Sequence, residues 1–462
     1  MRDRKMIANK IKSISHITFV CKNLEKTSHF LKELFDAKEI YSSNDKTFSI
    51  SKEKFFMVGD LWIAIMEGKS INQTYNHIAF SVNEKLLPMF EAKIKDLGLK
   101  ILPGRPRKHD EGKSIYFYDY DNHLFELHTG DLKTRLNFYN DKIQEQNALN
   151  WALQYLKLEE SATEFESKKI TDTSYSSVYK IQTLKNSYYL KQTPQALFTE
   201  PQILNFLTQH GCKNIPVIVA TNDNLCCFLM MASGDISLRT YFNGNLGLGM
   251  LKQGIANYTS IQHSMEKYTT DLMGLGVPDW RLDRFPTLYY QLIQQKQLLL
   301  DDGLSKTEIV QLQQLHPTCL RLRDELAQYK IPETIGHCDF HDNNMLLDQK
   351  TSSINIIDWG ETVITHPFLS LQGCLWHITY FYKVKPTDSI YHALQTQCVT
   401  PWLHLYAETK LLQALNIAAK LNGIYAALGF ARLYAATENQ LRLEHNGAIA
   451  GCLRSFLKAV ES

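Results

Sequence analysis

The sequence has few of the features that mark secreted or membrane-spanning proteins. Its 9 cysteines are scattered, odd in number and without a C-x-x-C pair, which favours a reducing, cytoplasmic compartment over a disulfide framework. The first residues are basic but lack the apolar stretch of a signal peptide. The most apolar late segment, residues 411–436, carries Lys420, Asn422 and Arg432, so it predicts a buried helix and no membrane span.

An excess of charge of one sign is also missing. Lys and Arg number 50 against 48 for Asp and Glu, which leaves a net charge of +2. This balance gives no reason to expect nucleic acid or a membrane surface as a partner. The chain has 462 residues, of which 44% are hydrophobic and 21% charged, so an ordinary globular protein with more than one domain is expected.

The texture of the sequence changes along the chain. Residues 14–130 alternate short β-rich runs with short amphipathic helices, whereas the chain from about residue 240 consists mostly of long helical patterns. A charged stretch between residues 131 and 166 predicts a helix and linker. The sequence therefore predicts an α+β protein of two domains, residues 1–144 and 145–462.

The first domain contains an internal repeat. The strand-like run ISHITFV (14–20) is echoed by YNHIAFSV (75–82), and each is followed by a helical pattern, residues 24–35 and 84–97. Each half then ends in further strand-like runs, which close with LWIAIMEG (61–68) and SIYFYDYDNHLFELHTG (114–130). The pattern predicts a βαβββ unit written twice.

His16 and His77 occupy the same place in the two repeats. Aligning the ends of the repeats puts Glu126 opposite Ala64, with spacings that agree to within one residue. If the halves pack about a pseudo-twofold axis, the two imidazoles face one another and form, with Glu126, a metal site that keeps positions open for substrate. Ordinary core histidines and a solvated carboxylate are the alternative, which three ligand types in symmetric positions disfavour.

These runs resemble the FosX-type fosfomycin-resistance proteins of the vicinal-oxygen-chelate superfamily, from Ile14 to about Tyr139. The resemblance implies a paired βαβββ fold, a homodimer whose active sites draw on both chains, fosfomycin as substrate, and Mn²⁺ bound by His16, His77 and Glu126. It also implies Glu53 as the base that activates water to open the epoxide to a vicinal diol. An exposed carboxylate between two lysines is the alternative for Glu53.

The phosphonate of fosfomycin needs cationic and hydroxyl donors. The resemblance implies that these donors are Thr18, Ser114, Tyr116 and Arg135. Arg107, in the basic run GRPRKHDEGKS (104–114), is a further candidate, for which a solvated turn is the alternative. Two other functions stay open for this domain: a fosfomycin thiol transferase, since a thiol ionises without a strong base, and a drug-sequestering protein.

The strongest signal in the second domain is IGHCDFHDNNMLLDQKTSSINIIDWGE (335–361). Two strand-like pieces, 345–347 and 354–357, predict a hairpin that brackets Asp339, Asn344 and Asp358. An aspartate base plus an Asn and an Asp that hold Mg²⁺ is the set that phosphoryl transfer from ATP requires. Zinc binding by His337, Cys338 and His341 is the alternative, which lacks a second ligand cluster.

This segment resembles the catalytic loop H-G-D-x-H-x-x-N of the aminoglycoside phosphotransferase and choline kinase superfamily. The resemblance implies a bilobal, protein-kinase-like domain from about Phe165 onward, with an N-lobe at about 160–235 and a C-lobe at about 236–462. Asp339 would be the catalytic aspartate, with Asn344 and Asp358 as Mg²⁺ ligands. The same likeness implies that Lys191, with its helix partner Glu200, holds the phosphates of ATP and that the backbone of Met231 binds adenine.

The segment also departs from the family pattern. Cys338 replaces the usual glycine of the loop, serines stand in the nucleotide loop TDTSYSSVYK, and His366 stands where relatives often carry Asp. None of these changes removes a catalytic group, so a working kinase fold is expected. A plain strand-end lysine is the alternative for Lys191, and a non-catalytic nucleotide-binding scaffold is the alternative for the domain. The motifs do not identify the phosphate acceptor.

Overall fold

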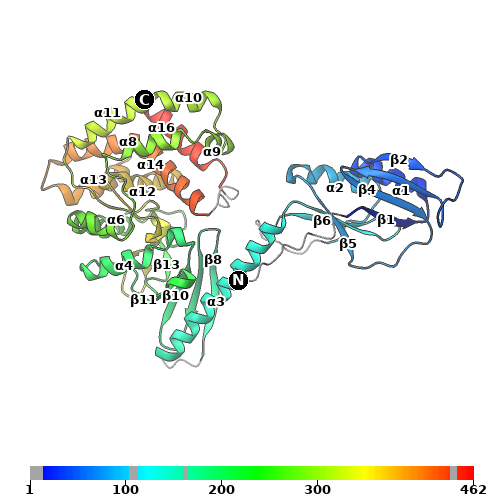
Figure 1. Ribbon diagram of the computed structural model, residues 1–462. Coiled ribbons are helices and arrows are strands. Elements are labelled where there is room, and N and C mark those ends of the chain that lie inside the picture. The colour runs from blue at the N-terminus through cyan, green and yellow to red at the C-terminus, as the bar shows by residue number, and fades with distance from the viewer. Residues whose placement is uncertain (1–13, 104–111, 160–163, 438–444, 462) are drawn as a thin grey trace, which may run out of the picture. The chain divides into compact units, whose positions relative to one another are not determined.

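The computed structural model describes residues 14–103, 112–159, 164–437 and 445–461, with the backbone alone for residues 133–142 (Figure 1). The chain forms two compact units, an N-terminal unit of residues 1–143 and a C-terminal unit of residues 144–462. Helix α3 (Leu132–Glu159) runs across the division. Both units combine helices and sheets, which confirms the α+β class. Among the described residues, none of the helices is both long and apolar enough to cross a membrane.

The N-terminal unit contains the predicted repeat. Its first half comprises β1 (His16–Cys21), α1 (Leu24–Phe35), β2 (Lys38–Ser42), β3 (Glu53–Val58) and β4 (Leu61–Glu67). Its second half comprises β5 (His77–Ser81), α2 (Leu87–Asp96), β6 (Ser114–Tyr118) and β7 (Leu124–His128). In the described part of this second half, an isolated bridge from Ile101 to Phe117 stands where the first half has β2.

The two halves form separate sheets, with strand orders β1-β4-β3-β2 and β5-β7-β6. In both sheets the first strand pairs in parallel with the last. Ala64 pairs with Thr18, two residues after His16, and Glu126 pairs with Ala79, two residues after His77. The register therefore confirms that Ala64 and Glu126 are equivalent positions of the repeat.

One apolar core lies under both sheets of the N-terminal unit. Strands alternate their side chains between two faces, and one face of each sheet is apolar here. Phe19, Ile63 and Ile65 of the first sheet share this core with Phe117 and Phe125 of the second. Functional residues are therefore expected on the other, outer face of each sheet.

The C-terminal unit begins with a five-stranded antiparallel sheet of order β11-β12-β10-β9-β8. Its strands are β8 (Glu166–Asp172), β9 (Ser177–Gln182), β10 (Ser187–Gln192), β11 (Ile218–Asn222) and β12 (Cys227–Met231). The end of α3 packs on one face of this sheet through Ala148, Ala152 and Leu156, against Tyr188 and Leu190 among others. Because side chains alternate along β10, Lys191 lies on the opposite face, toward α4 (Glu200–Gln209).

The rest of the C-terminal unit is mainly helical, and Figure 1 shows its long helices gathered at the end away from the five-stranded sheet. The described helices are α5 (Leu238–Phe242), α6 (Leu248–Met265), α7 (Thr269–Gly274), α8 (Phe285–Ile293), α9 (Lys296–Asp301), α10 (Lys306–Gln314), α11 (His316–Ala327), α12 (Pro367–Tyr382), α13 (Ser389–Val399), α14 (Glu408–Ala436) and α16 (Ala448–Glu461). The apolar segment 411–436 lies within α14, as a largely buried helix, as predicted.

Five short strands join these helices. They are β13 (Ile236–Ser237), β14 (Thr334–Gly336), β15 (Met345–Asp348), β16 (Ser353–Ile356) and β17 (Val363–Thr365). Strands β15 and β16 pair antiparallel, which confirms the predicted hairpin in the motif segment. This hairpin sets the positions of the polar residues that precede and follow it.

Candidate functional site

The outer face of the first N-terminal sheet carries three of the predicted site residues. His16 and Thr18 lie exposed on β1, and Glu53 lies on β3. Both Val20 and Glu53 pair with Met66 of β4, so Glu53 shares a face with the alternate residues of β1. The His16 ring contacts Trp62, with ring centroids 4.4 Å apart, and Ser49 Oγ donates to Glu53 Oε2 at 3.0 Å.

The outer face of the second sheet carries a tighter cluster. His77 Nε2 lies 2.9 Å from Glu126 Oε2, and Ser114 Oγ donates to Glu126 Oε1 at 2.6 Å. Burial opposes the ionisation of Glu126, but hydrogen bonds from Ser114 and Tyr116 outweigh it and lower the pKa of this carboxyl. Glu126 is therefore an anion at neutral pH, held close to an imidazole nitrogen.

The other nitrogen of His77 determines what the site can bind. His77 Nδ1 lies 2.9 Å from the backbone oxygen of Tyr75. Because a carbonyl only accepts, Nδ1 carries the proton, and in the neutral ring Nε2 turns a lone pair toward the Glu126 carboxylate. Either a proton on Nε2 or a metal ion shared with the carboxylate can therefore occupy the 2.9 Å between these two atoms. That separation also matches two neighbouring ligands that each lie about 2.1 Å from one metal ion.

His16 does not join this cluster within one chain. The two sheets turn their apolar faces to a shared core, so their outer faces, with His16 on one and His77 on the other, point away from each other. The only described group of three possible metal ligands within 4.8 Å of one another lies in the C-terminal unit. The expectation that the two imidazoles face one another is therefore wrong for a single chain, because the core lies between the sheets.

His128 is a member of the second cluster that the sequence reasoning missed. Its Nδ1 lies 2.7 Å from Ser114 Oγ and 3.5 Å from Glu126 Oε1. The signal was available, because His128 follows Glu126 by two residues on β7 and so shares its face. Of the other predicted residues, Arg107 lies outside the described residues, and Arg135 lies in α3 with its backbone alone described.

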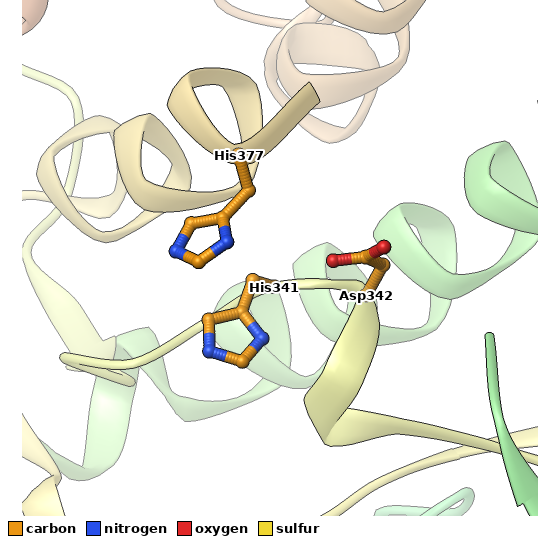
Figure 2. Close-up of side chains that lie close together, drawn as sticks. All are labelled: His341, Asp342 and His377. Carbon is orange, nitrogen blue, oxygen red and sulfur yellow. The ribbon is translucent and has the colours of Figure 1, made fainter. Parts of the chain in front are cut away.

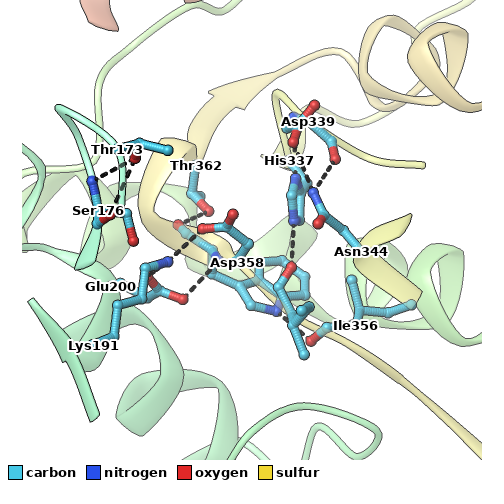
Figure 3. A network of polar contacts seen from close by, with 12 residues as sticks. Thr173, Ser176, Lys191, Glu200, His337, Asp339, Asn344, Ile356, Asp358 and Thr362 are labelled. Atoms are coloured by element: carbon cyan, nitrogen blue, oxygen red, sulfur yellow. Dashed lines mark hydrogen bonds and ion pairs between the residues drawn. The ribbon is translucent and has the colours of Figure 1, made fainter. Parts of the chain in front are cut away.

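The polar residues of the C-terminal unit meet where the five-stranded sheet approaches the β15–β16 hairpin (Figure 3). Lys191 is buried and forms ion pairs with Glu200, at 2.5 Å, and with Asp358. Burial disfavours the ammonium, but the two carboxylates outweigh it and raise the pKa of Lys191. Glu200 also accepts from the backbone N–H of Trp359 at 3.0 Å, so it ties α4 to the segment after β16.

Asp339 is oriented by its own loop. Asn344 Nδ2 donates to Asp339 Oδ2 at 2.8 Å, and His341 Nε2 lies 3.0 Å from Asp339 Oδ1. Partial burial opposes ionisation, but these two contacts outweigh it and lower the pKa of Asp339. Sequence reasoning considered His341 as a zinc ligand; the structure instead places it as a donor to the predicted catalytic carboxylate.

The structure disfavours the zinc alternative at this loop. Both ring nitrogens of His337 are engaged, since Nδ1 accepts from the backbone N–H of Asp339 at 3.1 Å and Nε2 lies 2.8 Å from the oxygen of Ile357. Cys338 is a free cysteine whose pKa is raised by burial to about 12, so its thiol is protonated at neutral pH. A neutral thiol, and an imidazole whose two nitrogens already form hydrogen bonds, are poor metal ligands.

Two predicted nucleotide elements have local structure of their own. Thr173 and Ser176 close the β8–β9 turn, where Thr173 Oγ1 accepts from the Ser176 N–H at 3.1 Å (Figure 3). Met231 ends β12, and its N–H donates to the oxygen of Val217 at 2.9 Å. The backbone contact from Met231 to adenine remains a prediction. Because the Met231 N–H is used in this hydrogen bond, the Met231 carbonyl would have to make the contact.

Comparison with known proteins divides the chain in the same way. The chain is 57% identical over 132 residues to the fosfomycin resistance protein FosX of Listeria monocytogenes, a match that covers 28% of this chain and 99% of that protein. Through its N-terminal unit, the chain belongs to the FosX family. The metallothiol transferase FosB of Bacillus licheniformis is 37% identical over 139 residues to this FosX-family chain, covering 29% of the chain and 86% of that protein.

A solved structure and a family profile complete the comparison. The FosX-family unit is 52% identical to a crystal structure of a FosX variant from Listeria monocytogenes, described as complexed with Mn(II) and 1S,2S-dihydroxypropylphosphonic acid. That match covers 28% of this chain and 98% of the other, with a TM-score of 0.26. Residues 168–395 match the phosphotransferase enzyme family. The chain therefore joins a FosX-family unit to a unit that matches the phosphotransferase enzyme family.

Proposed function

We propose that the N-terminal unit opens the epoxide of fosfomycin with water, at a metal site completed by a second copy of the chain. The observation that carries the proposal is the His77–Glu126 pair, whose ligand atoms lie 2.9 Å apart, a separation that two neighbouring ligands of one metal ion can have. The identity to FosX and the Mn(II) in its crystal structure support Mn²⁺ as that cation and fosfomycin as the substrate.

The second copy would supply His16 as the third ligand. The orientation of the sheets supports this, because the outer face that carries His16 cannot meet the outer face that carries His77 in one chain. Apolar side chains near these faces are exposed, notably Ile14 at 72%, Ile50 at 90% and Tyr75 at 73%. Apolar groups this exposed are typical of a surface that another chain covers, here a homodimer with two equivalent sites.

The reaction assigns a task to each residue. When bound, the metal would polarise the epoxide oxygen as its carbon–oxygen bond breaks. Glu53, held by Ser49, accepts a proton from the water that attacks the carbon next to phosphorus. The epoxide oxygen, released as that carbon–oxygen bond breaks, takes up a proton from solvent and becomes the second hydroxyl of the diol. Thr18, Ser114, Tyr116 and Arg135, with Arg107 as a weaker candidate, would bind the phosphonate oxygens.

Phosphorus NMR of the full chain with Mn²⁺ and fosfomycin tests the nucleophile. Water attack gives the vicinal diol at the same rate with and without added glutathione or another thiol. The rival reaction is thiol transfer, as the name of the FosB relative describes. A phosphonate adduct that forms only with thiol would assign the unit to that branch, and tight binding of fosfomycin without any product would favour a drug-sequestering protein.

Mixing two inactive variants tests the shared site. In a mixed dimer of His16→Ala and His77→Ala chains, one site loses both histidines and the other keeps both. An equal mixture should therefore recover roughly a quarter of the wild-type activity, because half of the dimers carry one intact site of two. A site formed within one chain would give no recovery.

For the C-terminal unit we propose ATP-dependent phosphate transfer to a hydroxyl group. The network around Lys191 supports it, because one buried cation joins Glu200 of α4 to Asp358 beyond the β15–β16 hairpin. Asn344 and Asp358 would hold Mg²⁺, which would neutralise phosphate charge, and Lys191 would bind the phosphates of ATP. Asp339 accepts the proton of the acceptor hydroxyl, in the orientation set by His341 and Asn344.

Calorimetric titration of the full chain with ATP and Mg²⁺ tests this assignment. Binding should be abolished in Asp358→Ala and retained in Asp339→Ala, which should fail only in transfer. ATP binding without hydrolysis or transfer in the wild-type chain would favour the non-catalytic scaffold, and absence of ATP binding would refute the kinase function.

A further inference from the structure

A cluster of possible metal ligands lies beside the catalytic loop of the C-terminal unit. The ligand atoms of His341, Asp342 and His377 lie within 4.8 Å of one another (Figure 2). The Arg239 side chain already serves this cluster as a cation: its Nη2 donates to Asp342 Oδ1 at 2.7 Å and lies 2.7 Å from His377 Nδ1. Tyr382 donates to the second Asp342 oxygen at 2.5 Å. The cluster is therefore a satisfied internal network and no vacant metal site.

This network connects Asp339 to the surface of α12 through packed rings. His341, whose Nε2 contacts Asp339, packs against His377 with ring centroids 4.3 Å apart. His377 in turn contacts Phe381 at 5.4 Å and Trp376 at 5.0 Å. The rings lead without a break from the predicted catalytic base to the last turns of the helix.

The end of this ring chain is an exposed aromatic face, formed by Trp376, Tyr380 and Phe381. Trp376 stacks on Tyr380 with centroids 5.0 Å apart and planes 11° apart, and Phe381 lies under the Arg239 guanidinium at 4.2 Å. The three side chains are 51%, 53% and 44% exposed. A stacked pair of exposed rings with a third exposed ring edge-on beside it, on the helix whose His377 packs against His341, is unusual for a helix surface without a ligand.

The helices around this aromatic face carry few groups that would attract a strongly cationic ligand. The sequence has no Asp or Glu from Thr362 to Thr387, which includes all of α12, and none from Ile236 to Met265, which includes α5 and α6. Asp342 is neutralised by Arg239, and Lys383 and Lys385 follow α12 directly. A polycation would meet cations that already lie against these rings, since Lys383 Nζ is 5.0 Å from the centre of the Tyr380 ring and the Arg239 guanidinium covers Phe381.

We infer that the aromatic face binds the apolar face of an uncharged, hydroxylated acceptor, such as a sugar ring that carries no amino groups, and presents a hydroxyl to Asp339. Aromatic rings pack against flat apolar surfaces, and the hydroxyl groups at the edge of a sugar ring stay free for transfer. The inference rests on the proposed kinase function and specifies its substrate class. It separates this unit from phosphotransferases that act on polycationic aminosugars.

Saturation-transfer NMR of the full chain with ATP and Mg²⁺ tests the inference with two probes, p-nitrophenyl β-glucoside and kanamycin. The uncharged glycoside should bind and kanamycin should not. Trp376→Ala and Tyr380→Ala should each weaken glycoside binding about fivefold or more, while the affinity for ATP stays unchanged. Tyr290→Ala is the matched control, since Tyr290 is a 51% exposed aromatic residue on α8 of the same unit.

The outcomes are distinct from those that test the kinase itself. Three results would overturn the inference while ATP still binds. They are preferential binding of kanamycin, binding of neither probe, and a glycoside affinity that is unchanged in Trp376→Ala and Tyr380→Ala. If ATP itself fails to bind, the proposed kinase function fails as well. Transfer of phosphate to the glycoside, lost in Asp339→Ala, would confirm that the bound hydroxyl faces the base.

Discussion

The two candidate sites are assembled in opposite ways. In the C-terminal unit, residues that are far apart in sequence, such as Lys191 and Asp358, meet within one chain and satisfy one another's charges. In the N-terminal unit, His77 and Glu126 meet on one sheet while His16 lies on the outer face of the other. An internal repeat with a shared core forces this separation, because the functional faces of the two sheets are the faces that do not pack together.

The difference teaches what each site needs in order to work. The described contacts of the C-terminal site all lie within one chain, so we expect a folded monomer to form it. If a second copy completes the N-terminal site, as proposed, fosfomycin turnover should fall when the protein is diluted below the dimer dissociation constant. The following changes probe this contrast, from the largest expected effect to the smallest.

Replacing His77 with alanine should abolish fosfomycin turnover, with a loss of about a thousandfold or more, because the metal loses a ligand and Glu126 loses its partner. Bound manganese, measured by elemental analysis, should fall in parallel. ATP binding by the C-terminal unit should be unaffected and serves as the folding control. Full turnover by this variant after chelation would contradict the metal site.

Asp339→Ala should abolish phosphate transfer, with a loss of about a hundredfold to ten-thousandfold, because the variant lacks the carboxylate proposed to accept the hydroxyl proton. The variant should still bind ATP, and it should still open fosfomycin at the wild-type rate. A fall in fosfomycin turnover would show that the two sites depend on each other, against the contrast drawn above.

Glu53→Gln should slow fosfomycin opening by about a hundredfold, since the amide keeps the shape of the side chain but cannot take a proton from water. Manganese binding should stay unchanged, which separates a base from a ligand. Lys52→Gln, next to it on the same chain segment, is the matched control and should leave the rate within about twofold. A normal rate in Glu53→Gln would remove Glu53 from the mechanism.

His341→Ala should have the mildest effect, about tenfold on phosphate transfer, with a change in pH dependence. Contacts from His341 lower the pKa of Asp339, so their loss raises that pKa. Asp339 must be ionised to act as a base, so activity falls at acidic pH. In the variant this fall should begin at a higher pH than in the wild-type chain. The pH profile of kcat/KM measures this shift, and an acid limb that stays in place would rule out His341 as a positioning residue.

Much of the fold could be predicted because its signals are local. The repeat of β-rich runs around α1 and α2, the β15–β16 hairpin and the buried α14 all follow from the spacing of apolar residues, and the structure confirms them. The site residues near each other on one strand or loop, such as Ser114 with Glu126 on paired strands, could be predicted in the same way. The hydrogen bonds of both ring nitrogens of His337 could not be predicted, because their partners are backbone groups that only the folded loop brings close.

By itself, the sequence determined the residue types of both sites, the equivalence of His16 with His77, and the separate identities of the two units. Tertiary structure alone decided which of these residues meet. The alternation of side chains along a strand predicts which residues share a face, but not how two sheets pack. In the N-terminal unit the sheets share an apolar core, so His16 and His77 lie on outer faces that point away from each other. In the C-terminal unit the fold places Arg239 next to Asp342 and His377. Its guanidinium therefore occupies the position at which three possible metal ligands lie close together.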